Sequence, residues 1–126
     1  MRLIKNLIRG GLAKLGFQIS RVDGQDVRFG AFVNLAKAYE AQLSQASGTE
    51  FSQNEGRYRL LAKLQGTPPT EAYSILEALT RCQSLDGDVC EFGVAEGDTS
   101  ALIANEIIAT DKKLHLFDSF EGLPKP

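Results

Sequence analysis

The spacing of apolar residues predicts helices along the first part of the chain. Between residues 31 and 46, apolar side chains recur every three or four positions, as expected for the buried face of a helix. A second helix is expected to begin with Ser52 and Glu55, which have the spacing of a capping box. It carries apolar residues at helical spacing and is expected to end near Gly66.

A proline pair separates this second helix from a third. Pro68 and Pro69 exclude helix at their own position and favour an extended turn, and the next helix is expected from about Thr70. Its inward positions are predicted to be Ala72, Tyr73, Ile75, Leu76 and Leu79. We therefore assign residues 1–84 to an N-terminal helical region.

The pattern changes after the tight turn that begins at Leu85. An almost wholly apolar run from Val89 to Val94 predicts a central parallel strand that is covered on both faces. A helix is expected after Gly97, and a second strand from Lys113 to Phe117. The residues of this helix that are predicted to face the sheet are Ala101, Leu102, Ile107 and Ile108. The predicted fold class is α/β, with N-terminal helices followed by one β-α-β unit in residues 85–126.

The opening segment is basic and amphipathic. Five basic residues precede the first acid, Asp23, and apolar residues recur among them at helical spacing. One interpretation is attachment to an anionic membrane surface. The other, which the weakening effect of Gly10 and Gly11 on a long helix favours, is packing on the chain's own domain or on a partner subunit.

Charge and composition exclude several functions. The net charge of −2 argues against nucleic acid as the main partner, because phosphate binding needs a concentrated basic surface. No apolar run approaches the ~18 residues of a membrane span. Cys82 and Cys90 fit neither a disulfide framework nor a metal cluster, so reduced, buried cysteines and a cytoplasmic location are expected.

The turn after the first predicted strand has the features of a ligand site. Gly93 and Gly97 allow the backbone to bend and to approach a ligand, and the next helix starts with polar residues at its positive end. Glu91 lies within the strand, where a carboxylate is costly unless it is paired or faces a polar ligand. Asp118 ends the second strand, 21 residues after Gly97, close to the ~20-residue spacing of a ribose-binding acid. The alternative for Asp118 is to cap the loop that follows it.

The acids around this turn favour one cofactor over another. Relative to G-x-G-x-x-G, Ala95 replaces the middle glycine and Asp98 the last, and Glu96 adds a further negative charge. Acids beside a diphosphate would repel it, whereas a ligand with an ammonium group and no phosphate tolerates them. This pattern favours S-adenosylmethionine over NAD.

The segments GDVCEFGVAEGDTSALIA and LHLFDSFEGLPKP resemble the macrocin O-methyltransferase (TylF-like) family of S-adenosylmethionine-dependent methyltransferases. The resemblance covers residues 87–126, with a lead-in helix before them. It implies a Rossmann-like sheet and the following cofactor-binding residues: Glu91, Gly93, Ala95, Gly97, Thr99, Asp118 and Ser119. In this scheme Thr99 helps to hold the methionine carboxylate, Asp118 binds the ribose, and Ser119 lies beside the adenosine. Thr67 is a weaker candidate for closing over the methionine end.

The resemblance also implies a small-molecule methyl acceptor and a divalent metal ion, magnesium, bound by acidic residues further along. No such ligands are identified in this sequence, and no catalytic residue is assigned. His115, the only histidine, is expected to be a packed side chain within the second strand.

Two adjacent strands are marginal alone, so we expect the chain to be the N-terminal part of a methyltransferase with little activity and with exposed apolar surface. Two alternatives remain. One is a non-catalytic binding or assembly module that forms a homo-oligomer or pairs with another subunit through its helices or sheet edge. The other is part of an NAD-dependent oxidoreductase.

Overall fold

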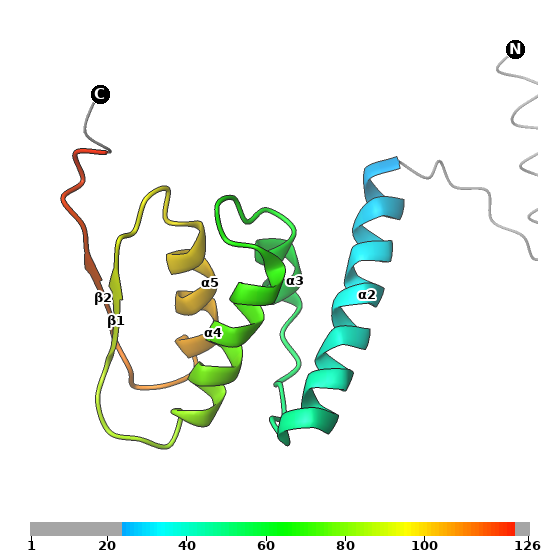
Figure 1. Ribbon diagram of the computed structural model, residues 1–126, viewed down its shortest axis with the longest axis horizontal. Coiled ribbons are helices and arrows are strands. Elements are labelled where there is room, and N and C mark those ends of the chain that lie inside the picture. The colour runs from blue at the N-terminus through cyan, green and yellow to red at the C-terminus, as the bar shows by residue number, and fades with distance from the viewer. Residues whose placement is uncertain (1–23, 123–126) are drawn as a thin grey trace, which may run out of the picture. The chain divides into compact units, whose positions relative to one another are not determined.

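The computed structural model describes residues 24–122, which form four helices and two strands (Figure 1). The predicted basic helix of the opening segment lies outside these residues. The elements in chain order are α2 (Gly24–Ser47), α3 (Glu55–Leu61), α4 (Pro69–Arg81), β1 (Val89–Phe92), α5 (Asp98–Ile107) and β2 (Leu114–Phe117). The architecture is therefore a mixture of helices with a small parallel sheet, which is compatible with an α/β fold.

The chain divides into two compact units between Ala31 and Phe32. Of the first unit the structure describes only residues 24–31, the exposed beginning of α2. Because these residues are exposed, they carry no apolar periodicity, and the predicted start of this helix at residue 31 was too late. Residues on both sides of the domain boundary expected after residue 84 belong to the second unit.

The start of α3 corrects the predicted capping box. The N-cap is Asn54, whose side-chain oxygen accepts a hydrogen bond from the Arg57 amide at 3.3 Å. The Ser52 hydroxyl instead accepts a hydrogen bond from the Arg57 guanidinium at 3.3 Å. The helix after the proline pair begins at Pro69, one residue earlier than predicted, because proline is well tolerated at the first helical position.

The two strands pair in parallel, with Val89 opposite Leu114 and Phe92 opposite Phe117. Helix α5 connects them and lies with α4 on one side of the sheet (Figure 1). The side chain of Glu91 points to that side, since it bonds to Ser100 of α5. This arrangement places the carboxyl ends of both strands beside the start of α5.

The opposite side of the sheet corrects three predictions. Among the described residues no helix covers it: Phe92 is 77% exposed and stacks on Phe117 with ring centroids 4.8 Å apart. Cys90 shares this face and is exposed, and Cys82, after α4, is exposed as well. The prediction that both cysteines are buried was therefore wrong. His115 is not packed: its Nε2 lies 2.8 Å from an Asp88 carboxylate oxygen, and the side chain is 46% exposed.

The buried face of α5 is rotated from the predicted one. Leu102, Ile103 and Ile107 are buried, whereas Ala101 is exposed and Ile108 is 83% exposed. The main core forms between α5 and the helices before it, not on the sheet alone. Its buried residues are Ala36, Tyr58, Leu61, Ala72, Tyr73, Leu76 and Leu102. Three of the five predicted inward positions of α4 are among them, and the other two are partly buried.

A buried ionic network crosses this core. The Arg57 guanidinium is 1% exposed and bonds to both Glu106 oxygens, at 2.9 and 2.6 Å, and to Glu40 at 3.2 Å. Glu40 also accepts hydrogen bonds from the hydroxyls of Tyr58 and Tyr73, at 2.9 and 3.0 Å. Burial, together with this carboxylate, raises the pKa of Tyr58 to about 12. The network joins α2, α3, α4 and α5 by charge-assisted bonds.

Replacing Phe92 by threonine should change the free energy of unfolding by less than ~1 kcal/mol, because the ring is exposed and threonine also suits a strand. Leu102→Ala, which removes a fully buried side chain of α5, should cost ~2–5 kcal/mol. Urea unfolding of both variants measures the difference. A loss near 3 kcal/mol for Phe92→Thr would mean that this sheet face is covered in solution.

No helix within residues 24–122 combines the length and the apolar character that crossing a membrane requires.

Candidate functional site

The candidate site lies where β1 ends and α5 begins. The backbone turns between these elements with a hydrogen bond from the Gly97 amide to the Val94 carbonyl at 2.9 Å. Three residues of the turn, Gly93, Ala95 and Gly97, have positive φ angles of 84°, 48° and 82°. Glycine adopts this conformation at little cost, whereas alanine is strained in it. The turn is thus held in a conformation that the sequence only partly favours.

The first turn of α5 carries unused hydrogen-bond donors. Its N-cap is Gly97, which has no side chain to accept them, and the amides at the start of a helix lack partners within the helix. The positive end of the helix dipole adds to their attraction for an anionic group. Helix α3 differs, because Asn54 caps it.

Glu91 is partly buried in β1, and its carboxylate accepts a hydrogen bond from the Ser100 hydroxyl at 2.5 Å. This bond provides the polar partner that a carboxylate within an apolar strand requires. The Ser100 hydroxyl can donate only one hydrogen bond, so the remaining lone pairs of Glu91 can accept hydrogen bonds from a ligand. Glu91 is therefore a suitable acceptor for an ammonium group.

The loop between α3 and α4 forms the other wall of the site. The Thr67 hydroxyl lies 2.9 Å from the Thr99 hydroxyl, and the Gln65 amide donates to an Asp98 carboxylate oxygen at 3.2 Å. Both contacts join this loop to the first turn of α5. Of the loop residues the sequence indicated only Thr67; the role of Gln65 depends on its backbone amide, which no side-chain pattern reveals.

These elements enclose a cavity of about 270 Å³. Its lining comprises Gln65, Gly66, Thr67, Glu91, Gly93, Val94, Ala95, Glu96, Gly97, Asp98 and Thr99. Five of the seven predicted cofactor-binding residues line it, and Asp118 and Ser119 do not. Three carboxylates, two hydroxyls and a helix start thus surround one space. We call it the strand-end cavity.

Asp118 lies directly after β2 and bonds to backbone amides. One carboxylate oxygen accepts from Val94 at 2.6 Å and Ala95 at 3.3 Å, and the other accepts from Phe120 at 2.9 Å. The hydrogen bonds from the Phe120, Val94 and Ala95 amides lower the pKa of Asp118. This is the loop-capping alternative that the sequence left open. The Ser119 hydroxyl accepts a hydrogen bond from the Glu121 amide. The ribose contact of Asp118 and the adenosine contact of Ser119 stay predictions.

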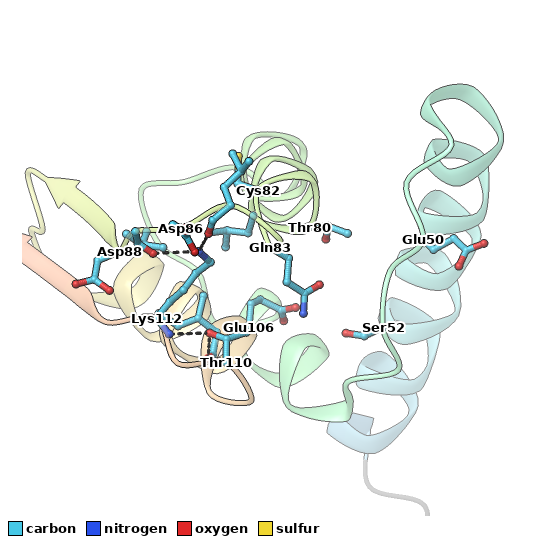
Figure 2. Close-up of a pocket in the computed structure, with 15 residues that line it drawn as sticks. Glu50, Ser52, Thr80, Cys82, Gln83, Asp86, Asp88, Glu106, Thr110 and Lys112 are labelled. Carbon is cyan, nitrogen blue, oxygen red and sulfur yellow. Dashed lines mark hydrogen bonds between the residues drawn. The ribbon is translucent and has the colours of Figure 1, made fainter.

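A second cavity, of about 290 Å³, lies at the amino end of the strands (Figure 2). There the Lys112 ammonium bonds to the carbonyls of Leu85 and Gly87, and so fastens the turn before β1 to the residues before β2. The Glu106 carboxylate at its margin is held by Arg57. The lining also includes the carboxylates of Glu50, Asp86 and Asp88. No pattern in the sequence indicated this cavity.

Residues 24–122 contain no group of three or more His, Cys, Asp and Glu side chains that could hold a metal ion. The magnesium ion implied by the resemblance stays a prediction, with no ligands assigned to it among these residues.

We found no protein-family model, no curated protein and no solved structure that matches this chain.

Proposed function

We propose that the strand-end cavity binds the amino-acid end of S-adenosylmethionine, and that the chain forms the cofactor-binding part of an O-methyltransferase with a Rossmann-like sheet. The observation that carries the proposal is the convergence of Glu91, Thr99 and the glycine turn on one cavity. These residues come from a strand, a helix start and the turn between them. The same residues carry the resemblance to the TylF-like family.

The charges of the cavity suit both ends of an amino acid. The carboxylates of Glu91, Glu96 and Asp98 would attract an ammonium or sulfonium group. The free amides at the start of α5 and the Thr99 hydroxyl would donate hydrogen bonds to the carboxylate of the amino-acid end. A diphosphate, in contrast, would meet three like charges, which disfavours NAD.

The size of the cavity fits part of the cofactor. Its volume of about 270 Å³ lies just below the ~300–1,000 Å³ usual for small-molecule pockets, so it would take the amino-acid end while the adenosine extends towards the end of β2. When bound, the sulfonium supplies the methyl group. The contribution of this chain is to hold and orient the cofactor, since no described residue is assigned as the base for an acceptor hydroxyl.

The exposed sheet face supports the second candidate, an assembly module. Phe92 and Phe117 stack on a face that parallel sheets normally cover. A module of this kind would bind another subunit through that face and would leave the strand-end cavity empty. Ligand binding therefore separates the two proposals.

Titration calorimetry with S-adenosylhomocysteine tests the first proposal. The full chain should bind it and should not bind NAD. Thr99→Val should weaken binding ~10-fold by removing a hydroxyl from the cavity, whereas Thr110→Val, at the amino-end cavity, should leave the affinity unchanged. Binding of NAD would favour an oxidoreductase. If neither ligand binds, the result would favour the assembly module.

A further inference from the structure

Asp118 joins two loops that are distant in sequence. It belongs to the loop after β2, where its carboxylate accepts a hydrogen bond from the Phe120 amide at 2.9 Å and lies 3.5 Å from the Ser119 hydroxyl. It also reaches the turn after β1, where one carboxylate oxygen accepts hydrogen bonds from the Val94 and Ala95 amides. Two successive amides that converge on one oxygen form a small anion-binding concavity, and here the chain's own carboxylate occupies it.

The turn that Asp118 holds is strained where it lines the strand-end cavity. Ala95 has φ of 48°, a conformation that costs an alanine more than a glycine. Strained residues persist when the surrounding structure holds them, and here the Asp118 carboxylate holds the amides of Val94 and Ala95. Without this acceptor, both amides would lose their hydrogen bonds to Asp118, and of the turn's own bonds the one from the Gly97 amide to the Val94 carbonyl would remain.

We infer that Asp118 is a positioning residue: its carboxylate keeps the turn from Gly93 to Gly97 in the conformation that opens the strand-end cavity, and so it acts on the ligand through the backbone. The inference rests on the proposed function, and the ribose contact implied by the resemblance stays a separate prediction, which the second test below distinguishes from it. Two observations support it. The Val94 and Ala95 amides both donate to one carboxylate oxygen, and Asp118 is not part of the cavity lining. The lowered pKa of Asp118 keeps the carboxylate charged at neutral pH.

The first test needs no ligand. In Asp118→Asn at neutral pH, hydrogen exchange at the Val94 and Ala95 amides should become ~10-fold faster or more, because an amide oxygen is a weaker acceptor than a carboxylate. Exchange within α3 should not change, which shows that the fold is intact. Glu121→Gln, a matched loss of charge in the same loop, should leave all these amides unchanged. Unaltered exchange at Val94 and Ala95 in Asp118→Asn would overturn the inference.

The second test compares two ligands, S-adenosylhomocysteine and its 2′,3′-dideoxy analogue, which lacks the ribose hydroxyls. Asp118→Asn should weaken the binding of both by the same factor, ~10-fold. Adding Ala95→Gly, which relieves the strained φ, should restore most of the affinity. A loss confined to S-adenosylhomocysteine would show that Asp118 acts through the ribose hydroxyls, and no rescue by Ala95→Gly would show that it does not act through the strained turn; either result would overturn the inference. Failure of the unaltered chain to bind either ligand would instead refute the proposed function, and with it the ligand-related part of the inference.

Discussion

Arg57→Met should lower the free energy of unfolding by ~3–5 kcal/mol, the usual cost of leaving a buried charge without its partner. The guanidinium is 1% exposed and, within residues 24–122, is the only basic group that forms ion pairs with Glu40 and Glu106. Its removal leaves two carboxylates of low exposure facing each other across the core. Because small domains have only ~5–15 kcal/mol of stability, the variant should be partly unfolded without denaturant.

Two further variants make this prediction specific. Arg59→Met, in the same helix but exposed, should change the stability by less than ~0.5 kcal/mol. Arg57→Met combined with Glu106→Leu should recover at least ~1 kcal/mol of the lost stability. The Glu40 carboxylate would still accept hydrogen bonds from the hydroxyls of Tyr58 and Tyr73. Urea unfolding followed by circular dichroism measures all three. If Arg57→Met and Arg59→Met have equal stability, the buried network contributes nothing.

Gly97→Val should abolish binding of S-adenosylhomocysteine, with a loss of affinity of ~100-fold or more. Gly97 has φ of 82°, and a β-branched residue is a severe outlier at such an angle. The backbone would have to rearrange at the N-cap of α5, which displaces the free amides that the proposed ligand needs. The free energy of unfolding should also fall, by ~1–2 kcal/mol.

Gly87→Val provides the matched control. Gly87 also has a positive φ, of 114°, and no neighbouring atom lies within 4 Å of an added Cβ at either glycine. It lies in the turn before β1, at the opposite end of the strand, so the variant should lose stability and keep its affinity. Equal losses of affinity in the two variants would mean that Gly97 acts only through general stability.

The sequence predicted the elements better than their surroundings. Apolar periodicity and Pro69 located α4 closely, and the short apolar runs located both strands, because these signals are local. The sharing of one cavity by Glu91, Gly93 and Thr99 was also predictable, since a strand, a turn and a helix start that follow one another must lie together.

Features that depend on distant pairing were not predictable. In the sequence, Arg57 looks like an ordinary exposed arginine of a helix. It is buried because it pairs with the carboxylates of Glu40 and Glu106, which lie 17 and 49 residues away. Ser52 was assigned to the helix cap, although the Arg57 guanidinium uses its hydroxyl. The exposure of Cys90 and Phe92 also depends on tertiary structure, because an apolar strand does not reveal which of its faces a helix covers.

The most direct test of the account is an amide chemical-shift map of the ¹⁵N-labelled full chain titrated with S-adenosylhomocysteine. The proposed function predicts that the shifts concentrate on two segments, residues 65–67 and 93–99, which line the strand-end cavity. The amides of Gln83 and Thr110, at the amino-end cavity, should not move. Shifts confined to Gln83 and Thr110, or no shifts at saturating ligand, would contradict it.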